Sequence, residues 1–261
     1  MERFGAPILR NGGEVMQGKN NFKRILSGIM SVAMAATLLP SLPAVAEDAA
    51  EKYPYTMFAA SDTEGAITIN ANNFCVNGNI ATNGTIVSSG NMNVNGTKTE
   101  NADEEMIYIL KKLNYSYFSG DNVETYADDY SFEDLNININ NPMDVNGTLE
   151  LTGNINLNSG IKAVEDVTIN GEVKNTNNSV ICSETGDINI ETSNVNFSGL
   201  IYAPYGDINI DTDNLNLNNV IIIGQTITID CPSINANYSN SMAELVGTES
   251  DIEVELYACG E

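Results

Sequence analysis

The feature that most constrains this chain is an internal repeat of 20 residues. The sequence Gly-Asp-Ile-Asn-Ile at 186–190 recurs unchanged at 206–210. The pattern of residues at 195–202 recurs, with similar residues, 20 positions later at 215–222. Looser copies extend in both directions along the chain. A fixed period of this length is typical of solenoids, in which each repeat stacks on the next.

Within each repeat, aliphatic residues alternate with Asn, Thr or Asp, and this period of two is typical of short strands with one buried face. Asn-Gly and Ser-Gly pairs separate the strands, and Asn and Gly both tolerate the positive φ of a sharp corner. The pairs are Asn77-Gly78, Asn83-Gly84, Asn95-Gly96, Asn146-Gly147, Asn170-Gly171 and Ser159-Gly160. The pattern predicts an all-β chain folded as a right-handed parallel β-helix, with three strands and three corners in each rung of about 20 residues.

We expect the β-helix to occupy two stretches, 65–98 and 135–257. Residues 65–98 and 135–246 would supply about seven turns spaced roughly 4.8 Å apart. A linker over 47–64 precedes the first stretch, and a tail over 258–261 ends the chain. The alternative fold is a sandwich or barrel of antiparallel hairpins. Strands of such a fold would be longer and would not recur in phase, so the repeat favours the β-helix.

Residues 99–134 lose the alternation and predict a small helical insertion. Apolar residues recur at helical spacing from Met106 to Tyr117 and would form one face of a helix. The acidic run at 103–105 suits the start of that helix. We expect the insertion to lie against one side of the solenoid or over one of its ends.

The two ends of the chain carry further signals. Residues 1–46 combine a polar leader, an apolar run over 25–39 and small residues at the end, which is the layout of a secretory signal peptide. The alternative is a membrane anchor, but a span needs roughly 20 apolar residues. We therefore expect a secreted protein, free or at the cell surface. At the other end, 249–257 predicts a last strand on an uncovered rung, which could associate end to end with a second copy.

The charge balance excludes several classes of function. The chain has 11 basic and 35 acidic residues, a formal net charge of −24 and no His. Removal of residues 1–46 would leave six Lys, 33 acidic residues and no Arg. Nucleic-acid binding needs basic side chains to replace counterions, and acidic polysaccharides are disfavoured for the same reason. Catalysis by a His base or an Arg clamp is absent. Cation binding, neutral ligands and structural roles remain.

Four cysteines, Cys75, Cys182, Cys231 and Cys259, are too few for a disulfide scaffold in a chain of this length. Their spacing matches no zinc site. Cys75 and Cys182 lie in strand-like text, so we expect them to be small apolar residues of the core.

Asp187 and Asp207 occupy the same position in successive repeats, with Asp211 and Asp213 just downstream. Stacked carboxylates could bind Ca²⁺, which takes six to eight oxygen ligands. Together with Glu184 they could also act as the acid and base of a glycoside hydrolase. The third interpretation, which we favour, is that each Asp side chain at a Gly-Asp corner bonds to its own turn.

Asparagine is the most unusual part of the composition, with 38 residues. Outward pairs such as Asn189 with Asn209 and Asn196 with Asn216 recur one repeat apart. We expect their amides to bond to one another along the rungs. The alternative is that they bind sugar hydroxyls.

The insertion region is rich in tyrosine, and exposed tyrosines can stack on sugar rings or anchor a protein partner. The candidate ligand-binding residues are Tyr108, Tyr115, Tyr117, Tyr126 and Tyr130. The alternative is that these rings pack the helix onto the solenoid.

Residues 197–210 are similar to a segment found in secreted β-helical surface proteins of Gram-positive bacteria. Their sequence is Phe-Ser-Gly-Leu-Ile-Tyr-Ala-Pro-Tyr-Gly-Asp-Ile-Asn-Ile. Over 65–257 the chain also resembles adhesin-type and bactofilin-like solenoids in general character. The resemblance implies a scaffold or adhesion role and carries over no catalytic residue. Pectate lyases and polygalacturonases share the β-helix, but their chemistry uses Arg, Lys or His, and fold alone does not establish function.

These observations predict a secreted, non-enzymatic scaffold or adhesion module that needs no cofactor. Its expected partners are a glycan or a protein at the cell surface, and not nucleic acid. The alternatives are a carbohydrate-active enzyme that uses carboxylates alone and a self-assembling solenoid.

Overall fold

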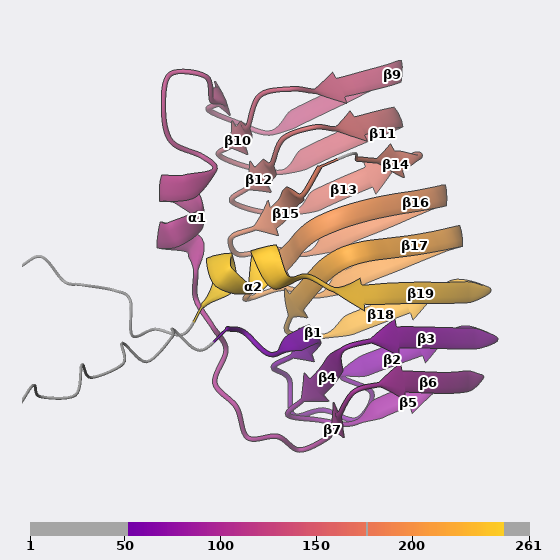
Figure 1. Ribbon diagram of the computed structural model, residues 1–261. Helices are drawn as coiled ribbons and strands as arrows, with labels where there is room; N and C mark the ends of the chain where they lie inside the picture. Colours follow the sequence, from indigo (N-terminus) through magenta and orange to yellow (C-terminus); the bar gives the residue numbers. More distant parts are fainter. Residues whose placement is uncertain (1–51, 176, 248–261) are drawn as a thin grey trace, which may run out of the picture. The chain divides into compact units, whose positions relative to one another are not determined.

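The computed structural model describes residues 52–175 and 177–247. It is a parallel β-solenoid of about nine turns with about 20 residues per rung, which confirms the predicted fold class (Figure 1). The signal peptide expected over 1–46, the strand expected over 249–257 and the tail over 258–261 lie outside the described residues.

Nineteen strands form one sheet, and every pairing between them in the described part of the chain is parallel. The strands are β1 (Tyr55–Ala59), β2 (Ile67–Asn70), β3 (Asn73–Asn77), β4 (Asn79–Thr82), β5 (Ile86–Ser88), β6 (Asn91–Asn95), β7 (Lys98–Thr99), β8 (Glu124–Tyr126), β9 (Tyr130–Ile139), β10 (Met143–Val145), β11 (Leu149–Leu157), β12 (Ile161–Ala163), β13 (Val167–Asn170), β14 (Val173–Lys174), β15 (Ser179–Ser183), β16 (Ile188–Ala203), β17 (Ile208–Gly224), β18 (Ile227–Asp230) and β19 (Ser233–Tyr238). The helices are α1 (Leu110–Ser116) and α2 (Asn240–Val246).

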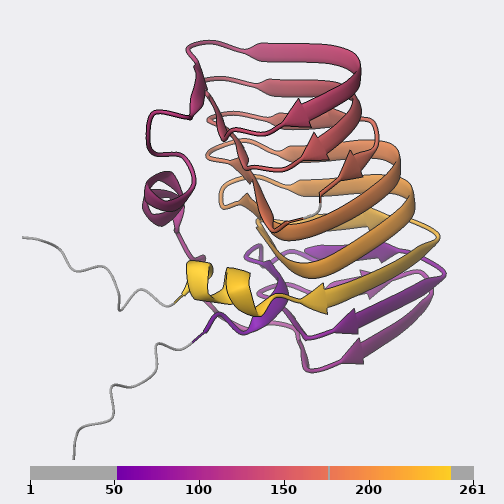
Figure 2. The same ribbon diagram turned by 45° about the horizontal axis from the view of Figure 1, so that its top comes forward.

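Each rung has three sides, so the solenoid has three faces, and the long strands β9, β11, β16 and β17 bend around corners from one face to the next. The covered face, which the two helices overlie, consists of β1, β4, β7, β8, β10, β12, β15 and residues 199–203 and 220–224. The acidic face consists of β2, β5, β13, β18 and residues 130–133, 149–152, 188–192 and 208–212. The amide face consists of β3, β6, β14, β19 and residues 136–140, 154–158, 194–198 and 214–218. Figure 2 shows the rungs as stacked loops with the helices on one side.

The core is a column of aliphatic side chains inside these rungs. Ile188 pairs directly with Ile208, and both are fully buried. The alternation therefore stacks like residues on like residues, as the repeat predicts. Full burial of one such side chain contributes about 1.5–3 kcal/mol.

The order of the rungs in space differs from their order in the sequence. The last C-terminal rung pairs with the N-terminal one, with Ile227 against Ile67 and Ile234 against Phe74. The strands β4 to β7 continue the solenoid beyond that point, and β8 and β9 form the opposite end (Figure 1). The last described C-terminal rung, which holds β18 and β19, is thus paired on both sides within the molecule, because the N-terminal rungs present the same Ile-x-Ile edge as a C-terminal continuation would.

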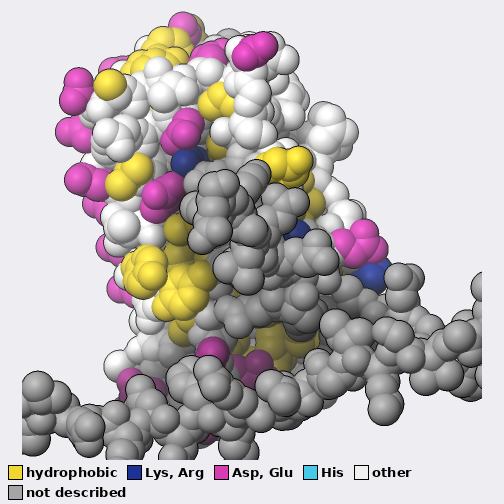
Figure 3. Space-filling model, turned by 90° about the vertical axis from the view of Figure 1, so that its left-hand side faces the viewer, with side chains coloured by type: hydrophobic (Ala, Val, Ile, Leu, Met, Phe, Trp, Pro, Cys, Tyr) yellow, Lys and Arg dark blue, Asp and Glu magenta, His cyan; other side chains and the backbone are white. Residues whose placement is uncertain are grey.

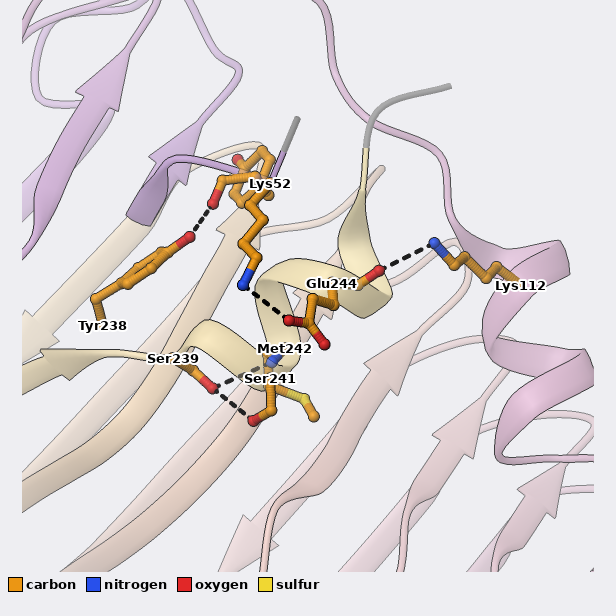
Figure 4. A network of polar contacts seen from close by, with 8 residues as sticks. Lys52, Lys112, Tyr238, Ser239, Ser241, Met242 and Glu244 are labelled. Carbon is orange, nitrogen blue, oxygen red and sulfur yellow. Dashed lines mark hydrogen bonds and ion pairs between the residues drawn. The ribbon is translucent and has the colours of Figure 1, made fainter. Parts of the chain in front are cut away.

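The junction between these two sets of rungs is fastened on the covered face by α2 (Figure 4). The Lys52 ammonium lies 2.8 Å from the Glu244 carboxylate. The Tyr238 hydroxyl donates to the backbone oxygen of Tyr53. Lys112 of α1 donates to the backbone oxygen of Glu244 at 3.2 Å. The helix α2 therefore ties together the start of the solenoid, its last C-terminal rung and α1.

The insertion crosses the length of the solenoid, and its helix is shorter than predicted. The helix α1 begins only at Leu110 because the preceding backbone bonds to the solenoid instead. The Tyr202 hydroxyl accepts the N–H of Ile109 at 3.0 Å and donates to the oxygen of Ile107 at 2.8 Å. Leu113 of α1 is fully buried against the covered face, so the insertion lies along a side.

Strands also begin within ranges that were expected to hold none. β1 lies in the expected linker over 47–64, and β8 and β9 start within the expected insertion over 99–134. The inward positions of that end rung hold Tyr126, Tyr130 and Phe132 in place of aliphatic residues, so the alternation is not recognisable there.

At the end of the solenoid formed by β5 to β7, the side chain of Glu100 bonds to the exposed strand edge. Glu100 accepts the N–H of Ile86 at 2.7 Å, a backbone group on the free edge of β5. This bond, aided by the nearby charge of Lys98, holds the pKa of Glu100 below its ordinary value. A charged group on an edge strand opposes pairing with another chain. End-to-end self-association stays a prediction.

Candidate binding face

The outward side chains of the amide face are almost all asparagine. In β17, for example, Asn214, Asn216 and Asn218 point outward while Leu215 and Leu217 are buried. The outward asparagines are Asn73, Asn77, Asn91, Asn93, Asn95, Asn136, Asn138, Asn140, Asn154, Asn156, Asn158, Asn194, Asn196, Asn214, Asn216, Asn218, Asn235 and Asn237.

These amides bond to one another from rung to rung. Asn95 donates to Asn77 at 2.7 Å, Asn77 donates to Asn237 at 2.6 Å, and Asn237 donates to Asn218 at 3.0 Å. This ladder crosses the junction between the N-terminal and C-terminal rungs without a break. Shorter ladders join Asn156 to Asn138, Asn158 to Asn140, Asn216 to Asn196 and, on the acidic face, Asn209 to Asn189. The predicted bonding of Asn189 with Asn209 and of Asn196 with Asn216 is confirmed.

The inter-rung bonds between these amides share one direction. In each, the side-chain N–H donates toward the end of the solenoid formed by β8 and β9. A carboxamide has two N–H donors and two acceptor positions on its oxygen, and the ladder uses one of each. The amide face therefore offers further donors and acceptors in rows, one rung or roughly 4.8 Å apart.

Charge is concentrated away from this face. Among the described residues of its strands, the one charged residue is Lys174, and it pairs at 2.5 Å with Glu172, which lies just before β14. On the acidic face, in contrast, Glu191, Asp211 and Asp230 stand in register on three successive rungs. A chain with a net charge of −24 thus keeps one long face nearly neutral.

Figure 3 looks onto the side of the molecule that carries the helices, where acidic side chains are many and basic ones few.

The described chain contains two helices, each of seven residues, and neither is long and apolar enough to cross a membrane.

The aspartates predicted to bind Ca²⁺ are not brought together. Asp187 and Asp207 lie at successive corners, where the Asp187 carboxylate accepts the N–H of Asp207 at 2.8 Å and the Asp207 carboxylate accepts the N–H of Thr226 at 3.2 Å. The expected bonding of each Asp to its own turn is therefore wrong for these two carboxylates, because each accepts an N–H group from the corner of the next rung. Asp211 points outward from the acidic face, and Asp213 lies at another corner. Within residues 52–175 and 177–247, no three potential metal ligands cluster closely enough to hold an ion. Ca²⁺ binding stays a prediction.

The candidate tyrosines separate into different places. Tyr126 and Tyr130 belong to the end rung, where their ring centroids are 3.8 Å apart and both pack against the core. Burial, with smaller contributions from Tyr130 and Glu124, raises the pKa of Tyr126 to about 12. Phe132 stacks beside Tyr130, so these rings close the end of the core.

The other three candidates lie along the insertion. Tyr108 packs against Tyr205 of the solenoid in a tilted arrangement, with ring centroids 5.2 Å apart. Tyr117 is half-buried beside Phe118, whereas Tyr115 is 83% exposed. These residues do not form one site, and ligand binding by the five tyrosines stays a prediction.

Two cysteines, Cys75 and Cys182, were expected in the core, and their side chains point away from the central column of aliphatic residues. Cys182 is buried, as predicted, but under α1 on the covered face, and burial strongly raises the pKa of its thiol. Cys75 does not belong to the core, because Phe74 and Val76 on either side of it point inward. Cys75 therefore lies among the outward amides.

No protein-family model matches the chain, and no curated protein matches it. Two solved structures are similar to it. One is an ice-binding protein from an Antarctic biological consortium, with 12% identity over 71% of this chain and 86% of that chain and a TM-score of 0.32. The other is the DUF3494 domain of ice-binding protein 1 from Shewanella frigidimarina, with 10% identity over 72% of this chain and 95% of that chain and a TM-score of 0.27. At these values the likeness carries no argument about function.

Proposed function

We propose that this chain is a secreted, non-enzymatic binding module whose amide face binds an uncharged, hydroxyl-rich polymer such as a neutral polysaccharide. The observation that carries the proposal is the neutral, amide-covered face on a strongly acidic protein. This face runs across the junction between the two sets of rungs.

The chemistry of the face matches such a ligand. A hydroxyl group both donates and accepts hydrogen bonds, and so does a carboxamide. The ladders fix the orientation of the amides before any ligand arrives, which lowers the entropy cost of binding. A polymer can engage several rungs at once, so weak individual contacts can add up to a useful affinity.

The alternative of a glycoside hydrolase that uses carboxylates alone has less support. Its best candidates, Asp187 and Asp207, accept backbone N–H groups at a corner of the solenoid. A pair of catalytic carboxylates must instead face the two sides of a bound glycosidic bond.

The test is binding to a panel of neutral polysaccharides, by affinity electrophoresis and then calorimetry, with two matched triple variants. The first carries Asn73→Asp, Asn91→Asp and Asn235→Asp, at exposed positions of the amide face. We expect at least a tenfold loss of affinity, or about 1.4 kcal/mol, because each change removes a donor and adds a charge.

The control carries the same substitution at exposed asparagines outside the amide face: Asn70, Asn122 and Asn240. Its net charge changes equally, and it should bind like the unmodified protein. Equal losses in both variants, or no binding to any polysaccharide, would contradict the proposal.

A second candidate ligand is ice, which also presents hydroxyl groups in a repeating array. The observation on this chain that favours it is the regular spacing of ordered amides on the neutral face. Inhibition of ice recrystallisation, lost in the amide-face variant and kept in the control, would assign this ligand in place of a polysaccharide.

A further inference from the structure

A buried lysine lies between α1 and the covered face of the solenoid. Lys162, in the middle of β12, is only 5% exposed. Its Nζ lies 2.8 Å from Oε1 of Glu184 and 3.2 Å from Oδ1 of Asp144. The same nitrogen lies 2.8 Å from Oδ1 of Asn114, which α1 carries over this face.

The surroundings of this lysine combine a nucleophile, an electrophile and proton acceptors. The ring of Phe118 covers the site, with its centroid 5.6 Å from Nζ. Burial opposes the charge of Lys162, but the hydrogen bond to Glu184 and the charges of Asp144 and Glu184 outweigh it, so the pKa of Lys162 is raised. The two carboxylates that hold the ammonium are therefore also the bases nearest to its protons.

We propose that Lys162 and Asn114 become joined by an isopeptide bond. Their side chains are already held together at hydrogen-bond distance in a site that excludes most water. Holding reacting groups together in one site is one of the main ways in which proteins accelerate such reactions.

The reaction balances without any co-reactant. One proton passes from the Lys162 ammonium to Glu184, and the freed electron pair of Nζ attacks Cγ of Asn114. The new Nζ–Cγ bond forms and the Cγ–Nδ2 bond breaks. Nδ2 takes the second proton of Nζ and the proton held by Glu184 and leaves as an ammonium ion. The third proton stays on Nζ, so the products are an amide and an ammonium ion.

Asn114 is the suitable electrophile among the three oxygen-bearing neighbours. Its carboxamide can release ammonia, whereas an ionised carboxylate has no comparable leaving group. Glu184 thus serves as the proton carrier, and Asp144 helps to hold the Lys162 ammonium in place. The bond would tie α1 to β12 across 48 residues of sequence, and a link of that length restricts the unfolded chain.

The test is the intact mass of the purified, folded protein. We expect it to be lower than the sequence mass by one ammonia. Peptide mapping should recover the peptide of Lys162 joined to the peptide of Asn114. The variants Asn114→Ala and Lys162→Arg should each have the full mass calculated from their own sequence. The double variant Asp144→Asn with Glu184→Gln should slow or abolish the loss of ammonia.

Two controls separate this bond from other sources of the same mass change. Cyclisation at an Asn-Gly pair such as Asn77-Gly78 also releases ammonia, but it does not depend on Lys162 and does not join two peptides. Lys174→Arg alters an exposed lysine and should leave the mass loss in place. The full sequence mass in the folded, unmodified protein, with the two peptides separate, would show that the cluster only anchors α1 and would overturn the proposal. This outcome is independent of what the amide face binds.

Discussion

Replacing Gly199 by alanine should destabilise the protein by about 4 kcal/mol or more, among the largest effects expected of one substitution. Gly199 turns the chain at a corner with φ of +138°, and a Cβ there would lie 1.9 Å from the backbone oxygen of Ser179 on the next rung. That oxygen cannot move without shifting the stacked rungs. Thermal unfolding followed by circular dichroism measures the loss.

The matched control is Gly120→Ala. Gly120 also has a positive φ, of +104°, but no atom lies within 4 Å of its added Cβ. It should lose only the conformational preference, about 1–2 kcal/mol. If both variants lost the same stability, the close contact between rungs at Gly199 would be refuted.

Separating the chain into residues 47–105 and 106–261 should have the second large effect. The break lies in the insertion, outside every strand and helix. The longer piece alone would expose the edges of β18 and β19 and the core beneath them, so we expect it to aggregate. Co-expression with the shorter piece should restore a soluble one-to-one complex, because β2 and β3 again cover those edges.

Size-exclusion chromatography with light scattering, together with circular dichroism, distinguishes the outcomes. A longer piece that stays folded and monomeric by itself, and gains nothing from its partner, would show that the N-terminal rungs do not support the C-terminal ones.

Much of the fold could be predicted because the alternation is strictly local. An alternation with a period of two indicates which side chains point inward, and the 20-residue repeat predicts that Ile188 and Ile208 are neighbours. The order of the rungs could not be predicted in the same way. The edge at 67–69 and the edge at 227–229 carry the same Ile-Thr-Ile text, so either could continue a neighbouring rung.

The helix was overestimated for a related reason. Apolar residues do recur at helical spacing from Met106 to Tyr117. However, the Tyr202 hydroxyl, 93 residues away, accepts the N–H of Ile109, so the backbone before Leu110 does not form the first turn of the predicted helix. A tertiary contact of this kind leaves no local signal in the sequence. The buried site of Lys162 was missed likewise, because its partners come from β10, from the residue that follows β15 and from α1.

The amide face was only partly predictable. The bonding of Asn196 with Asn216 follows from the repeat itself. The ladder from Asn218 through Asn237 to Asn77 does not, because it requires the N-terminal rungs to lie beyond the C-terminal ones.

An engineered disulfide tests the junction between the N-terminal and C-terminal rungs directly. In a background of Cys75→Ser and Cys259→Ser, Asn77→Cys with Asn237→Cys places two thiols on directly paired residues of adjacent rungs. Their Cα atoms should be roughly 4.8 Å apart, within the range that a disulfide spans. Asn95→Cys with Asn237→Cys is the control, two rungs or roughly 9.6 Å apart and too distant to bridge. We predict that the first pair forms an intramolecular disulfide under mild oxidation, seen by non-reducing electrophoresis and peptide mapping, and that the second does not. Free thiols at 77 and 237 in the folded, oxidised protein would contradict the continuous solenoid and its continuous amide face.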